Sequence, residues 1–163
     1  MAAELFVDTS AWYPALVQSH PDHARVAAAL RKAVRAGHRL VTTNLVVAET
    51  HALLMRRAGQ GAALTFVRAA ASPPNLVVQS SADHQRAAVE QWLSVYEDQD
   101  FSYADAVSFA VMKARGIEEA LTLDRPSTIG TPKKCTRTCA SAADCAAPFP
   151  SCIATPYGWK ICI

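Results

Sequence analysis

Two acidic residues each end a short apolar run, which is where carboxylates that do chemistry sit in α/β proteins. Asp8 follows the run 5–7, and Asp124 follows the run 120–123. Both runs are typical of short buried strands. Because sites in open α/β sheets form at the carboxyl ends of strands, these two carboxylates are expected at one edge of a sheet.

Two further acids lie on predicted helices. Glu49 stands between Leu45 and Leu53 in a helical row that is otherwise apolar, so its carboxylate is expected to point toward packed surface. Asp105 comes three residues after Ser102, as in a capping box at the start of a helix. Its spacing therefore fits two roles, a helix cap and a member of an acidic site.

Several carboxylates gathered in one place repel one another, and burying them without a partner costs several kcal/mol. No lysine or arginine is adjacent in sequence to Asp8 or Glu49. A divalent cation, Mg²⁺ or Mn²⁺, is the simplest partner for such oxygen ligands. The chemistry indicated is metal-assisted hydrolysis of a phosphodiester. Taken singly, Asp8 also fits a helix cap, Asp124 a turn and Glu49 a hydrogen-bonded core residue; the joint pattern favours the metal site.

The elements that must position these acids alternate between strands and helices. Strands are predicted at 5–7, 40–42, 76–78 and 120–123, and helices at 11–18, 21–36, 45–57, 62–71, 81–96 and 102–115. Alternation of this kind predicts an α/β fold with a mainly parallel sheet and helices on both faces.

The chain divides by composition into a body and a tail. Residues 1–124 carry 11 basic and 13 acidic residues and no cysteine, whereas 125–163 carry 5 basic residues, 1 acidic residue and all five cysteines. We therefore predict a domain at 1–125, followed by a linker and cysteine-rich tail of unknown role at 126–163. No apolar run approaches the ~20 residues of a membrane span, and the first residues lack the basic start of a signal peptide.

The cysteines of the tail are open to two interpretations. They show no Cys-x-x-Cys pair, which argues against a zinc site, so a small disulfide module or an unstructured extension remains. A body without cysteine fits a reducing cytoplasm, while a dense cysteine cluster fits an oxidising compartment. His20 and His23 beside Asp22 suggest either a solvated helix start, which we favour, or a metal cluster.

Four segments together resemble the PIN-domain ribonucleases, in particular the toxins of bacterial VapBC toxin–antitoxin pairs. They are FVDTSAWYPALV, TTNLVVAETHALLMRR, FSYADAVSFAVMKARGI and ALTLDR, which frame residues 4–125. The resemblance implies an α/β/α sandwich and an endoribonuclease that depends on Mg²⁺ or Mn²⁺. It also implies a cytoplasmic protein with an RNA substrate, a cognate antitoxin as partner, a homodimer and no membrane association.

Carried over by position, the resemblance implies that Asp8, Glu49, Asp105 and Asp124 are the catalytic, metal-binding acids. Thr9 or Ser10 would position a metal-bound water or a phosphate of the substrate. The sequence departs from the family after Arg125, where the usual final strand is replaced by the tail. Two alternatives therefore stay open: a catalytically impaired, PIN-shaped interaction module, and a secreted cysteine-rich protein whose body only mimics the family.

Overall fold

The computed structural model describes residues 3–96, 102–123, 152–154 and 160–162, and only the backbone in the last two ranges. Asp124 and most of the cysteine-rich tail lie outside the described residues. The predicted linker and the predicted disulfide module fall on these same residues. None of the helices in the described part of the chain has the length and apolar character of a membrane span.

A parallel sheet forms the centre of the fold, as the alternating sequence pattern predicts. Its strands are β1 (Glu4–Val7), β2 (Arg39–Thr43), β3 (Asn75–Val78) and β4 (Glu119–Leu121). β1 lies between β2 and β4, and every pairing among these four strands is parallel. Short apolar strands suit this position, because a parallel sheet covered on both faces is buried throughout.

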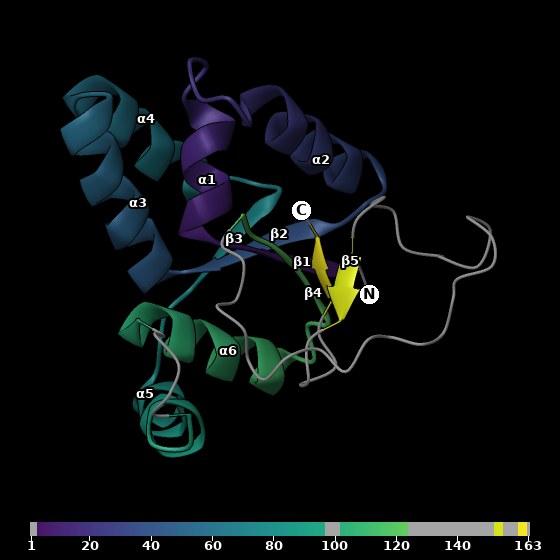
Figure 1. The fold of residues 1–163 in the computed structure, drawn as a ribbon, viewed down its shortest axis with the longest axis vertical. Coiled ribbons are helices and arrows are strands. Elements are labelled where there is room, and N and C mark those ends of the chain that lie inside the picture. The colour runs from purple at the N-terminus through teal and green to yellow at the C-terminus, as the bar shows by residue number, and fades with distance from the viewer. Residues whose placement is uncertain (1–2, 97–101, 124–151, 155–159, 163) are drawn as a thin grey trace.

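Helices cover both faces of the sheet (Figure 1). One face carries α1 to α4, with α1 packed against both α2 and α3, and the other carries α5 and α6. Their bounds are α1 (Thr9–Leu16), α2 (His23–Arg35), α3 (Asn44–Arg57), α4 (Gln60–Ala70), α5 (Ala82–Ala88) and α6 (Tyr103–Arg115). The predicted α/β/α sandwich is therefore confirmed.

Two helices begin earlier than the sequence pattern indicates, because the residue before each supplies the cap. Asp8 caps α1 directly by accepting a bond from the Ser10 N–H, so Thr9 and Ser10 belong to the first helical turn. Thr43, rather than Asn44, caps α3 through its hydroxyl group. The long helix expected over 81–96 is α-helical only to Ala88 and continues as a π-helical turn at Val89–Leu93.

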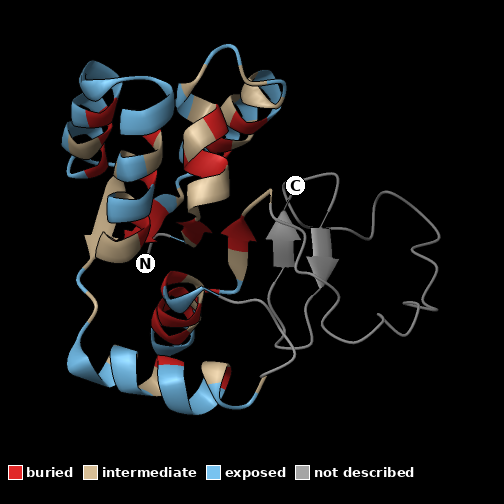
Figure 2. Cartoon of the chain, turned by 60° about the vertical axis from the view of Figure 1, so that its left-hand side comes forward, coloured by how far each residue is buried: buried red, intermediate tan, exposed pale blue. Residues whose placement is uncertain are grey.

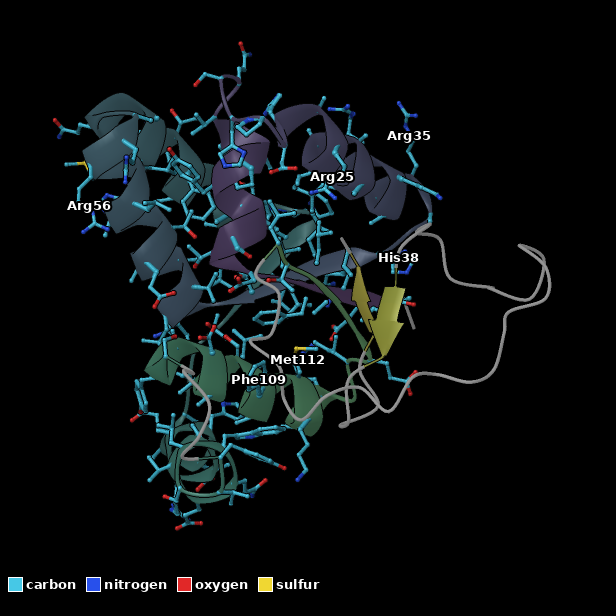
Figure 3. The ribbon with its side chains drawn as sticks, in the orientation of Figure 1. Arg25, Arg35, His38, Arg56, Phe109 and Met112 are labelled. Carbon is cyan, nitrogen blue, oxygen red and sulfur yellow. The ribbon has the colours of Figure 1, made fainter. Side chains whose placement is uncertain are left out.

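The core consists of two clusters of buried side chains (Figure 2). The larger part joins the strands to α1–α4, with Leu5, Val41, Leu54 and Phe66 fully or almost fully buried. The smaller part lies between α5, the π-helical turn and α6, where the ring of Trp92 packs against that of Phe109. Figure 3 shows that Arg35 and Arg56 instead project outward from α2 and α3. The sheet edge that carries Asp8 is thus fixed from both sides.

Two strands from the tail extend the sheet beyond β4. β6 (Lys160–Cys162) pairs parallel with β4, and β5 (Cys152–Ala154) pairs antiparallel with β6. The sheet order is therefore β3-β2-β1-β4-β6-β5. Residues beyond the predicted nuclease domain thus supply an edge to its sheet, a role that the cysteine spacing did not suggest.

A pair of glycine substitutions tests how α6 ends and leads into β4. Gly116 caps α6 at φ 67°, a left-handed conformation, and a Cβ there would meet no atom within 4 Å. We expect Gly116→Ala to destabilise the fold by about 1 kcal/mol through backbone strain alone. Gly61 lies inside α4 with equally open surroundings, so Gly61→Ala should instead stabilise it by roughly 0.5–1 kcal/mol. Urea denaturation gives the change in the free energy of unfolding for each variant, which should fall for Gly116→Ala and rise for Gly61→Ala. Changes of the same sign in both variants would contradict this account.

Candidate active site

The candidate site lies at the topological switch point of the sheet, at the carboxyl ends of β1 and β4. From β1 the sheet continues to β2 and β3 on one side and to β4 on the other. Crevices at such points, outside the carboxyl ends of the strands, are the usual ligand sites of open α/β sheets. Asp8 stands at the end of β1, and its N–H donates to the carbonyl oxygen of Leu121 at the end of β4, at 3.2 Å.

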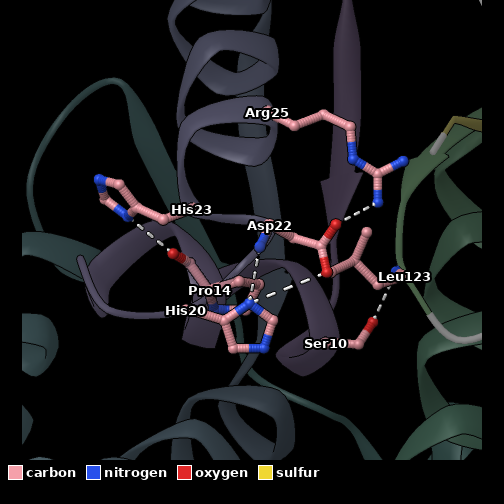
Figure 4. Close-up of polar contacts among 7 residues, drawn as sticks. All are labelled: Ser10, Pro14, His20, Asp22, His23, Arg25 and Leu123. Carbon is pink, nitrogen blue, oxygen red and sulfur yellow. Dashed lines mark hydrogen bonds and ion pairs between the residues drawn. The ribbon is translucent and has the colours of Figure 1, made fainter.

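The carboxylate of Asp8 is held by three hydrogen bonds that all reach one oxygen. Its Oδ2 accepts from the Ser10 N–H at 3.1 Å, from the Ser10 hydroxyl at 2.8 Å and from the Thr122 hydroxyl at 3.4 Å. Ser10 Oγ in turn accepts from the Leu123 N–H at 2.9 Å (Figure 4). The first acid is therefore tied to α1 and to the chain that leaves β4.

Glu49 lies on α3 at the solvent-exposed rim of the site. The prediction that its carboxylate points into packed surface is wrong: the buried row of α3 is Val46, Thr50 and Leu54, one position further along the helix. The Thr9 hydroxyl donates to Glu49 Oε2 at 3.2 Å, and the Thr50 hydroxyl donates to Thr9 Oγ1 at 3.4 Å. Thr9 thus links the first turn of α1 to the second acid.

Asp105 occupies the first turn of α6 and completes a capping box with Ser102. Its Oδ2 accepts from the Ser102 N–H at 2.9 Å, while its own N–H donates to Ser102 Oγ at 3.1 Å. Asp105 therefore does cap α6, as its spacing from Ser102 predicts. This capping does not displace a functional role, because the negative charge of Asp8 also acts on this carboxylate.

The pKa values of Glu49 and Asp105 are both raised. Burial raises the pKa of Glu49, the Thr9 hydrogen bond opposes this shift, and the charges of Asp105 and Asp8 raise the pKa further. Burial also raises the pKa of Asp105, the bonds from Ser102 oppose the shift, and the charge of Asp8 adds to it. The negative charge of Asp8 thus acts on both Glu49 and Asp105, and the charge of Asp105 acts on Glu49.

No basic side chain in the described part of the chain pairs with these acids. The ion pairs there involve other carboxylates: Asp22 pairs with Arg25, Asp83 with Arg86, and Glu4 with Arg115 at 2.6 Å. A cation from outside the chain would therefore relieve the repulsion among Asp8, Glu49 and Asp105. Their oxygen-only donor set is the one that Mg²⁺ and Mn²⁺ prefer.

The acids do not form a closed metal cage. Within the described ranges, no three acidic, histidine or cysteine side chains are grouped closely enough to hold an ion. Mg²⁺ commonly binds through one or two carboxylates and keeps several waters, so an open arrangement of acids fits this ion. The fourth predicted acid, Asp124, lies outside the described residues, one position after Leu123.

Two threonines near the acids, Thr122 and Thr50, could not be predicted as part of the site from the sequence pattern. Thr122 follows β4 in a short apolar run, and Thr50 lies on the buried row of α3 with no exposed surface. Thr9 or Ser10 is predicted to position a metal-bound water or a phosphate, and in the structure the Thr9 hydroxyl bonds to Glu49 and the Ser10 hydroxyl to Asp8. Hydroxyl contacts of this kind depend on elements distant in sequence, so a single sequence does not reveal them.

The histidines near α2 serve the turn that precedes this helix (Figure 4). His20 Nδ1 accepts from the Asp22 N–H at 3.1 Å, and His23 Nδ1 bonds to the carbonyl oxygen of Pro14 at 2.9 Å. Asp22 is paired with Arg25 at 2.7 Å. These contacts match the favoured interpretation, a helix start, rather than a metal cluster.

Known proteins share both this sequence and this fold. The family described as the PIN domain matches residues 5–126. The 23S rRNA-specific endonuclease VapC20 of Mycobacterium tuberculosis is 35% identical over 120 residues, covering 74% of this chain and 88% of that protein. This chain therefore belongs to the PIN-domain family, and within it the chain is VapC-like.

Solved structures agree with this assignment. The crystal structure of M. tuberculosis VapC20, a toxin that cleaves the sarcin–ricin loop, gives a TM-score of 0.66 at 31% identity, covering 74% of this chain and 89% of the other. A toxin–antitoxin complex from Klebsiella pneumoniae gives 0.53 at 14% identity, covering 78% and 92%, and so supports the fold alone. The predicted enzyme class, an endoribonuclease of the VapC type, is thereby confirmed.

Proposed function

We propose that this protein is the toxin of a toxin–antitoxin pair and hydrolyses phosphodiester bonds of ribosomal RNA with the help of Mg²⁺ or Mn²⁺. The observation that carries the proposal is the acidic site at the junction of β1 and β4, whose charges no described basic side chain neutralises. The choice of ribosomal RNA follows the VapC20 relative, which cleaves 23S rRNA.

Each acid has a defined part in this reaction. Asp8 offers a carboxylate oxygen at the end of β1, while Glu49 and Asp105 approach from α3 and α6. Together with Asp124, they would hold the ion and orient its waters. A bound Mg²⁺ supplies a water of lowered pKa and stabilises charge on the phosphate oxygens.

A cleavage assay with controlled metal tests the proposal. Purified protein incubated with ribosomal RNA should cleave it in Mg²⁺ or Mn²⁺ and lose at least about 100-fold of that rate in EDTA, with recovery when the metal is restored. Mg²⁺ should also raise the Tm of the protein, because an ion that binds only the folded state stabilises it. Unchanged cleavage in EDTA would refute the metal requirement. Complete inactivity of metal-loaded protein would favour the impaired module instead.

The partners and the place of action follow from the same proposal. A toxin that cleaves ribosomal RNA must be held by an antitoxin, and inserted basic side chains of that partner would pair with the acids of the site. We also propose that the protein acts in the cytoplasm, where its substrate occurs. We propose further that it forms a homodimer. The body without cysteine is consistent with that reducing compartment.

A further inference from the structure

The two oxygens of the Asp8 carboxylate have different surroundings. All three hydrogen bonds to this group end on Oδ2, from the N–H and hydroxyl of Ser10 and the hydroxyl of Thr122. No described residue bonds to Oδ1. The carboxylate is therefore held by one oxygen within the protein, while the other stays available for an ion or its water. Rotation of the group is restrained because three donors would have to be given up together.

The hydroxyl groups of Ser10 and Thr122 each have a single proton, which limits the hydrogen bonds that each can donate. Ser10 Oγ has one proton and two lone pairs, and it contacts Asp8 Oδ2 at 2.8 Å, Thr122 Oγ1 at 2.8 Å and the Leu123 N–H at 2.9 Å. The N–H can only donate, and an ionised carboxylate can only accept. The proton of Ser10 goes to Asp8 Oδ2, and the single proton of Thr122 can point to Ser10 Oγ at 2.8 Å or to Asp8 Oδ2 at 3.4 Å.

These contacts make Thr122 the far end of a brace across the switch point of the sheet. The brace, formed by Thr122, Ser10 and Asp8, joins the chain leaving β4 to the first turn of α1 and to the end of β1. The backbone bond from Asp8 N–H to Leu121 runs beside it, at 3.2 Å. The hydroxyl group of Thr122 thus contacts both Ser10 and Asp8, and Ser10 in turn bonds to Asp8.

We infer that Thr122 is a positioning residue: its hydroxyl contacts both Ser10 and Asp8 Oδ2 and so holds the Asp8 carboxylate in an orientation in which Oδ1 could bind an ion or its water. This inference rests on the proposed function, and it assigns Ser10 to the brace instead of to direct contact with substrate. Loss of the Thr122 hydroxyl removes one hydrogen-bond partner from Ser10 and from Asp8 Oδ2, so the Asp8 carboxylate is held less firmly. Because Thr122 itself is not placed against RNA, substrate binding should be little changed.

Three variants separate the hydroxyl from the rest of the side chain. Thr122→Val keeps the shape and removes the donor, whereas Thr122→Ser keeps the donor. Thr65→Val is the matched control, since Thr65 is an exposed threonine on α4 that bonds only to the carbonyl oxygen of Gly61. We expect Thr122→Val to lower kcat about tenfold with KM for ribosomal RNA unchanged, and Thr122→Ser and Thr65→Val to stay within about twofold of wild type.

Binding of Mn²⁺, followed by electron paramagnetic resonance, gives a second measurement that needs no RNA. Thr122→Val should bind Mn²⁺ several-fold more weakly than wild type, and Thr122→Ser should match wild type. Equal Mn²⁺ binding and kcat in Thr122→Val and wild type would overturn the inference. So would an equal loss in Thr122→Ser, which would assign the effect to the methyl group. If Thr122→Val does not fold, Thr122→Ala removes the same hydroxyl with a smaller side chain.

The outcomes also distinguish this inference from the proposed function. A wild-type protein that cleaves no RNA contradicts the proposed function, and the Mn²⁺ comparison then still decides the role of Thr122. A wild-type protein that cleaves RNA alongside an equally active Thr122→Val contradicts the brace alone.

Discussion

Asp8→Asn is expected to lower kcat for RNA cleavage by about 100-fold or more while leaving the protein folded. Asparagine keeps the size of the side chain and still caps a helix well, so the bond that the Ser10 N–H donates to the side chain at position 8 survives. The charge that would hold the metal is lost. Single-turnover cleavage gives the rate, and circular dichroism with a thermal melt confirms the fold.

Asp83→Asn is the matched control for this change. Asp83 is an acid at the start of α5 with 85% of its side chain exposed, paired only with Arg86 on its own helix. Its removal should leave the cleavage rate within about twofold of wild type, since an exposed pair contributes little. An Asp8→Asn protein that is folded and cleaves like wild type would contradict the assignment of the site.

Glu49→Gln is expected to lower the cleavage rate by about 100-fold as well, and also to stabilise the metal-free protein at neutral pH. The reason for the second effect is the repulsion described above: Asp105 and Asp8 act on a partly desolvated carboxylate. Glutamine keeps an acceptor for the Thr9 hydroxyl and removes the charge. Activity and stability should therefore change in opposite directions, as they do where function requires like charges to be held together.

The sign of the pH dependence follows from the raised pKa of Glu49. Because the folded state holds its proton to higher pH than the unfolded state does, the folded state loses stability as pH rises from the unfolded pKa through the folded pKa. The metal-free wild type should therefore approach Glu49→Gln in Tm under acidic conditions and fall below it at neutral pH. At neutral pH, Mg²⁺ should reduce the difference in Tm between the wild type and Glu49→Gln, because it stabilises the wild type.

Thermal melts of both proteins in EDTA, across pH 4 to 8, measure this effect. Glu118→Gln, which removes an exposed acid between α6 and β4, should show no such pH-dependent gain. A Glu49→Gln protein that is less stable than wild type at neutral pH without metal would contradict the account, because it would show that the carboxylate is stabilising in that state.

The order of strands and helices could be predicted from the sequence because it depends on local patterns. Apolar runs such as 5–7 and 76–78, the capping box at Ser102 and the stop at Gly116 each act within a few residues. The exact ends were less secure, since Asp8 and Thr43 cap helices that the pattern began two residues and one residue later. Asp8, Asp105 and Asp124 were predicted as site acids from their positions at the ends of elements, and Glu49 from its place in an otherwise apolar row of a helix.

What the acids contact was decided only by the tertiary structure. Glu49 shares an apolar row by sequence, yet α3 turns Val46, Thr50 and Leu54 to the core and leaves Glu49 at the rim. Thr122 became a partner of Ser10 because β4 pairs directly with β1, a contact between residues more than 100 positions apart. Local propensity determines the elements of this chain, whereas the pairing of distant strands determines which side chains meet, because that pairing depends on how the whole core is packed.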